Sequence, residues 1–181
     1  MGSIEVICGS MFSGKTEELI RRLKRLSYAN KTFKVFKPEV DSRNKKNSIQ
    51  SHSKIEIEAQ SVNKATEILK YKESFDVVGI DEAQFFSYDI VEVCNKLANS
   101  GVRVIVAGLD MDYLGKPFGP MPSLMAIAEE VTKVHAVCAD TGLPALYSFR
   151  KLENEDVVML GDKNEYEPLS RKAYVSKMKK K

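Results

Sequence analysis

Gly9-Ser10-Met11-Phe12-Ser13-Gly14-Lys15-Thr16 is the stretch that decides the fold. It has the form GxxxxGK[ST], which is typical of a phosphate-binding loop (P-loop) that joins a strand to a helix. Residues 4–8 before it are short and β-prone, and apolar residues after it recur at helical spacing. Those residues are Leu19, Ile20, Leu23 and Leu26. Strand, loop and helix follow in the order that the motif needs, which argues against a glycine- and serine-rich turn that matches by chance.

Each part of this loop has a role in binding phosphate. Gly9 and Gly14 let the backbone turn and approach phosphate oxygens closely. The loop amides and the positive end of the helix then face the anion. Lys15 adds a positive charge at the β- and γ-phosphates, and the Thr16 hydroxyl is a ligand for Mg²⁺. The motif predicts a site for ATP with its metal.

A second motif lies at residues 75–82, where an apolar run ends in Asp81 and Glu82. This is the Walker B pattern, a buried parallel strand with carboxylates at its carboxyl end, where ligands bind in open α/β sheets. We expect Asp81 to hold Mg²⁺ through water, facing Thr16. We expect Glu82 to lie where it can act as a base. The alternative is an N-cap for the following helix.

Strand-like and helical segments alternate through most of the chain, which implies a parallel sheet with right-handed crossovers. The further expected strands are 34–36, 55–58 and 102–107, and the further helices are 62–72, 88–100 and 124–131, the last capped by Ser123. The predicted fold class is α/β: a P-loop (RecA-like) parallel sheet flanked by helices at residues 1–132 and a small β-rich C-terminal lobe at 133–175. The lobe's strand-like runs are 134–138, 145–149 and 157–160, and a basic tail follows at 176–181.

Composition limits the classes of protein that fit. A chain of 181 residues with 43% hydrophobic residues suggests one domain with a real core. No apolar run approaches the roughly 20 residues of a membrane span, and residues 1–3 lead directly into a strand without a signal peptide. Cys8, Cys94 and Cys138 lie far apart, which argues against a disulfide scaffold and for a reducing cytoplasm. Cys94 lies on the apolar side of its predicted helix, so we expect it in the core.

Three features leave alternatives open. The net charge of +3 and several basic segments would suit a nucleic-acid binder, but no base-reading module accompanies them, so we expect no nucleic acid. The polar residues 41–54 predict either a flap over the nucleotide or an idle solvated loop. His135 has no partner pattern, and we expect it at the surface or in packing rather than in catalysis.

Several motifs together closely resemble the type II thymidine kinases, in order and over nearly the whole chain. They are the P-loop, then Asp81-Glu82-Ala83-Gln84-Phe85-Phe86, then Gly108-Leu109-Asp110 with Tyr113 and Lys116-Pro117-Phe118-Gly119, then His135-Ala136-Val137-Cys138 with Ser148 and Arg150. The P-loop is generic, whereas the second and third motifs are much more specific.

The resemblance implies transfer of the γ-phosphoryl group of ATP to the 5′-hydroxyl of thymidine, and of deoxyuridine, giving nucleotides for DNA synthesis. It implies that Glu82 is the general base, that residues 81–84 bind ATP, and that Asp41 and Arg43 of the flap lie near the phosphates. The implied substrate pocket comprises Met11, Phe85, Leu109, Tyr113, Phe118, Ser148, Val157, Met159 and Tyr166. Its aromatic residues suit a flat base, which the family reads largely through main-chain groups of its C-terminal lasso. The family also implies a homotetramer that dTTP inhibits.

The chain departs from the family at its zinc site. The family's C-terminal lobe usually carries four zinc ligands, whereas here Cys138 remains and Thr141, Ser170 and Ala173 stand at the other three positions. Structural zinc needs four ligands, mostly thiolate or imidazole. We therefore predict no zinc and a lobe held by packing and hydrogen bonds. Tyr113 is a second departure, because a phenylalanine is common there.

Two other functions compete with the kinase. A DNA-stimulated P-loop ATPase would use the basic segments, and a nucleotide-binding switch would need no acceptor-side base. Only a kinase accounts for Phe85, Phe118 and Tyr166 beside a P-loop. The predicted function is therefore a thymidine kinase that uses ATP with Mg²⁺.

Overall fold

The centre of the protein is a six-stranded sheet in which every neighbouring pair of strands is parallel. The computed structural model describes residues 2–40, 48–50, 56–151 and 164–180. The order across the sheet is β5 (Gln60–Val62), β2 (Phe33–Pro38), β6 (Val77–Ile80), β7 (Arg103–Gly108), β1 (Ser3–Cys8) and β8 (Glu130–Lys133). This arrangement confirms the α/β class, because strands joined through helices pair in parallel.

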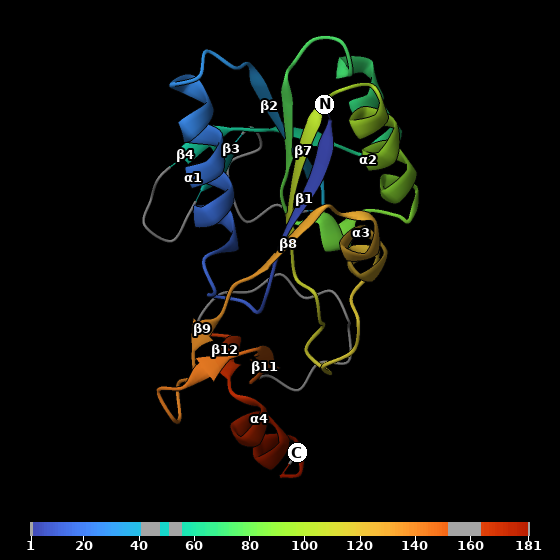
Figure 1. Ribbon diagram of the computed structural model, residues 1–181. Coiled ribbons are helices and arrows are strands. Elements are labelled where there is room, and N and C mark those ends of the chain that lie inside the picture. Colours follow the sequence, from blue (N-terminus) through green and yellow to red (C-terminus); the bar gives the residue numbers. More distant parts are fainter. Residues whose placement is uncertain (1, 41–47, 51–55, 152–163, 181) are drawn as a thin grey trace.

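Helices cover both faces of the sheet (Figure 1). α1 (Lys15–Ser27) packs on one face through its apolar stripe, including Leu19 and Leu23, both 0% exposed. α2 (Asp89–Asn99), the 3₁₀ helix η1 (Ala65–Tyr71) and α3 (Met121–Ile127) pack on the other. With both faces covered, the central strands β6 and β7 are buried and apolar almost throughout, as parallel strands usually are. None of the helices in the described part of the chain combines the length and the hydrophobicity of a bilayer span.

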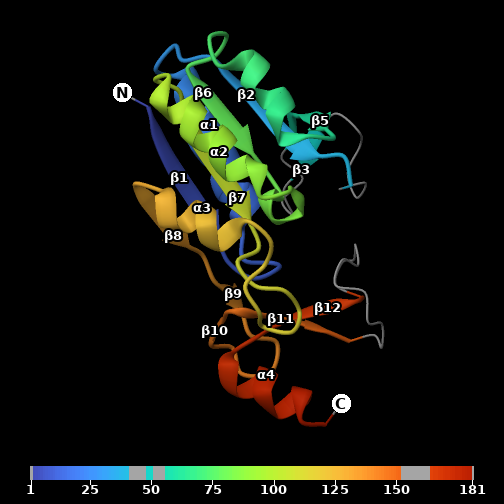
Figure 2. The ribbon, with the colours of Figure 1, turned by 90° about the vertical axis from the view of Figure 1, so that its right-hand side faces the viewer.

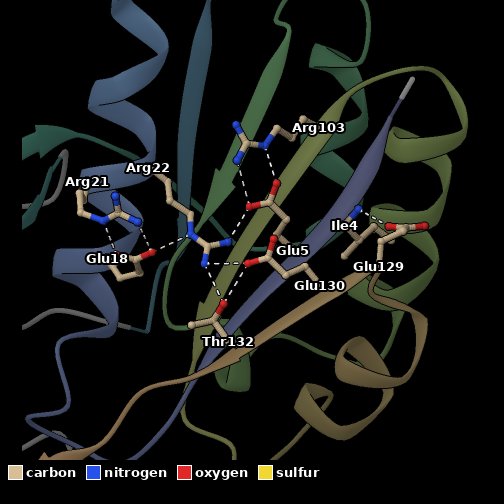
Figure 3. A network of polar contacts seen from close by, with 9 residues as sticks. All are labelled: Ile4, Glu5, Glu18, Arg21, Arg22, Arg103, Glu129, Glu130 and Thr132. Carbon is tan, nitrogen blue, oxygen red and sulfur yellow. Dashed lines mark hydrogen bonds and ion pairs between the residues drawn. The ribbon is translucent and has the colours of Figure 1, made fainter.

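A polar network fixes α1 and the edge strand β8 to the sheet (Figure 3). Glu5 of β1 accepts hydrogen bonds from Arg22 of α1, with an Nη1–Oε2 distance of 2.6 Å, and from Arg103 of β7. Arg22 also bonds to Glu130 and Thr132 of β8. Burial alone would raise the pKa of Glu5, but its two arginine partners outweigh burial and lower that pKa. Because the side chains of Arg22 and Glu5 are only 10% and 11% exposed, removing either one would leave an uncompensated buried charge.

The C-terminal lobe lies beyond the carboxyl ends of the sheet strands (Figures 1 and 2). It contains two antiparallel pairs, β9 (Ala136–Val137) with β10 (Pro144–Ala145) and β11 (Tyr147–Arg150) with β12 (Tyr166–Leu169), and the helix α4 (Arg171–Met178). Its core is separate from those of the sheet, and Tyr147 stacks on Tyr174 there at 4.4 Å between ring centroids. This core holds α4 against β11.

Two parts of the N-terminal region differ from the sequence-based expectations. Residues 41–54 are not wholly irregular, because β3 (Ser48–Gln50) pairs antiparallel with β4 (Glu56–Glu58) and buries Ile49 to 1% exposure. The remainder of that segment lies outside the described residues. The predicted helix at 62–72 is the seven-residue 3₁₀ helix η1, which packs against α2.

The helix predicted from Ser123 to Val131 is wrong at both ends. α3 begins after Pro120, so that Ser123 lies inside the helix rather than at its cap. The chain turns extended at Ala128, and Val131 belongs to β8, which pairs with β1. The apolar spacing of this segment suits a helix, but pairing with the free edge of β1 prevails. This is a tertiary effect that overrides a local pattern.

The end of the chain also differs from the expected basic tail. α4 continues past residue 175, because Lys177 forms ion pairs with Asp140 and Glu167 of the lobe. Neither α4 nor β12 was predicted. The predicted strand at 157–160 lies outside the described residues. His135 is exposed, as expected, and Cys94 is buried in the core.

Candidate active site

The P-loop leaves β1 and enters α1 through two glycines with positive φ. Gly9 has φ 148° and Gly14 has φ 85°. A Cβ atom on Gly9 would lie 2.2 Å from the Val134 carbonyl oxygen, so only glycine fits there. Gly14 is the N-cap of α1, and no side chain caps this helix end. The first amides of α1 therefore remain available for an anion.

Polar side chains order the loop itself. The Lys15 ammonium donates to the Ser10 carbonyl oxygen at 2.8 Å, and the Ser13 hydroxyl donates to the same oxygen at 2.7 Å. At the root of the loop, the Lys133 ammonium lies 2.6 Å from the buried carboxylate of Asp110. Because β1 lies between β7 and β8, this ion pair links the residues that follow β7 to the end of β8 across the strand that carries the loop.

Thr16 and Asp81 meet at the carboxyl ends of β1 and β6, as predicted. The Thr16 hydroxyl donates to Asp81 Oδ2 at 3.1 Å, and Asp81 is 4% exposed. Burial and, after it, repulsion from Glu82 raise the pKa of Asp81 to about 7. A hydroxyl oxygen beside a buried carboxylate fits Mg²⁺, which prefers oxygen ligands and would favour the ionised carboxylate. Thr16 and Asp81 are therefore the residues that can hold the metal.

Glu82 follows in an unusual conformation. Its φ of 52° is left-handed, which is uncommon for a residue other than glycine and is typical of functional sites. Its carboxylate accepts a hydrogen bond from the Gln84 amide at 2.5 Å, and Gln84 in turn accepts one from the Leu109 N–H at 2.9 Å. The base predicted from sequence is thus oriented by a neighbour that also holds the loop after β7.

One cleft joins the phosphate loop to the predicted base and to part of the predicted substrate pocket. Its lining comprises Met11, Phe12, Gly14, Lys15, Thr16, Glu17, Glu82 and Leu109. P-loop residues, the side chains of Glu17 and Glu82, and apolar side chains therefore line the same space. Such a site suits transfer of a phosphoryl group to a hydroxyl acceptor, because positioning and charge neutralisation do most of the work in that reaction.

The remaining described residues of the predicted substrate pocket contact one another or Arg150. Phe85 packs edge-on against Phe118 at 5.7 Å between centroids. The Met11 N–H donates to the Ser148 hydroxyl at 2.9 Å, which connects the P-loop directly to the lobe. Tyr113 and Tyr166 both contact Arg150. Asp41, Arg43, Val157 and Met159 lie outside the described residues, so their roles stay predictions.

Sequence reasoning included neither Arg150 nor Tyr174 among the site residues. Arg150 is 1% exposed and stacks on Tyr113, and the Tyr174 hydroxyl donates to the Tyr113 carbonyl oxygen at 2.8 Å. The resemblance named Arg150 beside Ser148 in its last motif, directly after the β-prone run at 145–149, but it assigned Arg150 no role. No signal in the sequence indicated the second, because it depends on where α4 packs.

The four positions of the family's zinc site lie together around Cys138. Cys138 and Ala173 share the lobe's buried cluster. Burial alone would raise the pKa of the Cys138 thiol, but the polar groups of Thr141, Ser170 and the Asp140 backbone favour the thiolate and lower that pKa to about 6. Among the residues that the structure describes, no group of three or more histidine, cysteine, aspartate or glutamate side chains is placed to hold a metal ion. That the protein lacks zinc stays a prediction.

Comparison with known proteins gives a consistent result. A family model described as thymidine kinase matches residues 2–174. The chain is 54% identical over 173 residues to a thymidine kinase of Bacteroides fragilis (strain YCH46), covering 96% of this chain and 87% of that one. It is 56% identical to one of Porphyromonas gingivalis (strain ATCC 33277), at 96% and 85% coverage, and 53% identical to one of Rhodothermus sp. (strain ITI 518), at 96% and 82%.

A solved structure described as a DNA replication initiation factor is a far more distant match. It gives a TM-score of 0.46 at 12% identity, over 74% of this chain and 40% of that one. A likeness at this level carries no argument about function.

Proposed function

Because the chain belongs to the thymidine kinase family and phosphorylates thymidine with ATP, we propose that the cleft between the P-loop and Glu82 is its active site. The observation that carries this proposal is the shared lining of that cleft. Lys15 and Thr16 of the P-loop, the Glu82 carboxylate and Leu109 all face it. The donor phosphates and the acceptor hydroxyl can therefore meet without a large movement of the sheet.

In this site the P-loop binds the phosphates of ATP. The uncapped amides of α1 and the Lys15 ammonium contact the β- and γ-phosphate oxygens. Thr16 and Asp81 hold Mg²⁺, which when bound neutralises charge on those phosphates. The lysine hydrogen bond to Ser10 keeps its side chain along the loop until phosphate competes for it.

Glu82 prepares the acceptor. Its carboxylate accepts the proton of the thymidine 5′-hydroxyl as that oxygen forms a bond to the γ-phosphorus. The bond from the γ-phosphorus to the bridging oxygen breaks, and ADP leaves with the electron pair. Gln84 orients the carboxylate through its hydrogen bond and ties it to Leu109 on the acceptor side.

The thymine base binds between the loop after β7 and the lobe. Phe85, Phe118 and Tyr113 supply aromatic surface, and Met11 and Leu109 connect it to the cleft. Together with Ser148 and Tyr166, these are the described members of the pocket that the family resemblance implies; Val157 and Met159 are its other two members. The C-terminal lobe would act as the family's lasso, on a RecA-like P-loop domain.

Four further properties follow from the family resemblance and are part of the proposal. They are phosphorylation of deoxyuridine, inhibition by dTTP in the thymidine site, a homotetramer, and Asp41 and Arg43 near the phosphates. A cytoplasmic location, inferred from the sparse and widely spaced cysteines, is also part of the proposal. Competition between dTTP and thymidine in steady-state kinetics tests the inhibition. Light scattering of the purified protein tests the tetramer, and a monomer would refute it.

The direct test is ATP consumption with Mg²⁺ in the presence of thymidine, other nucleosides, single-stranded DNA or no addition. We expect turnover that depends on thymidine and yields dTMP. Turnover that ignores thymidine and rises with DNA would support the ATPase alternative instead. As a test of the site, Lys15→Met should raise the KM for ATP, with loss of most turnover and little change in thermal stability, because Lys15 is partly exposed and lines the cleft.

A further inference from the structure

Arg150 is the largest side chain buried to less than 2% exposure in the described part of the chain. It lies on β11 of the lobe, in register with Tyr166 of β12. Its Nε and Nη2 atoms donate to the Tyr166 hydroxyl at 3.1 and 2.9 Å. Burying a guanidinium is costly unless its hydrogen bonds are satisfied, so this contact needs an explanation beyond packing.

The same guanidinium lies over the ring of Tyr113, with its central carbon 3.7 Å from the ring centroid. A cation stacked on an aromatic face is attracted more strongly when it is removed from water than when it is exposed. Tyr113 belongs to the loop after β7, not to the lobe. Arg150 therefore joins three elements that line the proposed thymidine pocket: β11, β12 and that loop.

The loop that carries Tyr113 is internally braced, so it can be positioned as a unit. The Asp112 N–H donates to the Lys116 carbonyl oxygen, and the Asp112 carboxylate accepts from the Leu114 and Lys116 N–H groups, each at 2.9 Å. A second contact with the lobe comes from α4, whose Tyr174 hydroxyl donates to the Tyr113 carbonyl oxygen. Arg150 fixes the ring of Tyr113 and Tyr174 fixes its backbone.

We propose that Arg150 is a positioning residue for thymidine, holding the ring of Tyr113 and the hydroxyl of Tyr166 so that the base enters a preformed aromatic wall. This inference rests on the proposed substrate pocket. Arg150 is proposed to act through the two tyrosines rather than on the substrate, because it is 1% exposed and contacts both of them. A preformed wall reduces the ordering cost of binding, so the effect appears in thymidine affinity. The P-loop and Glu82 make none of the described contacts of Arg150, so the chemical step is spared.

Lysine cannot replace this arginine. A guanidinium is planar, so it can lie flat on the Tyr113 ring while two of its N–H groups point at one hydroxyl. The compact ammonium group of lysine could contact either the Tyr113 ring or the Tyr166 hydroxyl, but not both at once. Arg150→Lys is therefore expected to fall between the wild type and Arg150→Met in its KM for thymidine.

The test compares steady-state kinetics and melting temperatures of Arg150→Met, Tyr113→Leu and their double variant. We expect Arg150→Met to raise the KM for thymidine about tenfold or more, as loss of a buried cation–π contact predicts, with the KM for ATP changed less than about twofold. The double variant should raise the KM by less than the product of the two single effects, because both single changes remove the contact between Arg150 and Tyr113. Arg171→Met is the matched control: Arg171 is exposed and lies over Tyr147 at 5.1 Å, outside the proposed pocket, and this variant should keep the wild-type KM.

An unchanged KM for thymidine in Arg150→Met would overturn the inference. A parallel rise of the KM values for thymidine and for ATP, together with a lower melting temperature, would also overturn it, because that result marks a purely structural role. If Arg150→Met does not fold, Tyr166→Phe removes the hydroxyl from the other side. It should then raise the KM for thymidine alone, and an unchanged value would refute the proposal. A wild-type protein without thymidine-dependent turnover would refute the proposed function itself, which separates the two failures.

Discussion

Glu82→Gln tests the catalytic assignment with the smallest change in shape. The glutamine side chain has the same length as glutamate, and its carbonyl oxygen can still accept the hydrogen bond from Gln84. The left-handed backbone conformation at residue 82 costs glutamine as much as glutamate, because both carry a Cβ atom, so we expect it to be kept. The substitution removes the negative charge and the ability to accept a proton. We therefore expect the pocket to keep its form and the chemistry to fail.

The expected loss follows from the role of a positioned base. Such a group contributes about 10²- to 10⁴-fold, which corresponds to about 3 to 5 kcal/mol in activation free energy. Stability should not fall, because repulsion from Glu82 is one of the causes that raise the pKa of the buried Asp81. Removing that charge should leave the melting temperature equal or higher.

The assay measures kcat at saturating ATP, Mg²⁺ and thymidine, together with direct binding of ATP. We expect ATP affinity within about threefold of the wild type and kcat reduced by at least about 10²-fold. Glu17→Gln is the matched control, because Glu17 lines the same cleft and the substitution makes the same charge change. A loss of kcat as large in Glu17→Gln, or near-normal kcat in Glu82→Gln, would refute the base role.

Three more predictions follow from the described contacts. The arginines beside Glu18, Arg21 first, lower its pKa to about 2. Its stabilising effect is therefore present above its unfolded pKa near 4.5 and is lost as the pH falls toward 2. The loss of stability caused by Glu18→Gln, measured by urea unfolding, should shrink over that pH range, and a loss that stays constant would contradict this. Gly9→Ala should abolish ATP binding or folding because of the clash with the Val134 carbonyl, whereas Gly142→Ala, at φ 69° with open space around it, should cost only about 1 kcal/mol in thermal unfolding. Ser148→Ala removes the acceptor of a P-loop N–H group and should lower the free energy of unfolding by about 1 to 3 kcal/mol and raise the KM of both substrates; a rise for thymidine alone would contradict the proposed link between loop and lobe.

The sequence determined the parts of this protein that depend on short-range patterns. The P-loop between β1 and α1 is a local strand–loop–helix unit, so its eight residues were sufficient to predict it. The acids at the end of β6 follow from where a buried parallel strand stops, and the pairing of Thr16 with Asp81 follows from the shared edge of a parallel sheet. The reaction followed from the more specific motifs.

The tertiary structure decided the contacts between residues far apart in the chain. β8 begins at Glu130, within the last residues of the predicted helix, because the free edge of β1 offered backbone partners. The Ser148 hydroxyl reaches the Met11 N–H across 137 residues, and Arg150 stacks on Tyr113 from another part of the chain. Helical and strand periodicities report which face of an element is apolar, but they do not report which element will cover it. The wall of the proposed thymidine pocket depends on which elements pack together, and that packing is decided only when the lobe contacts the loop after β7.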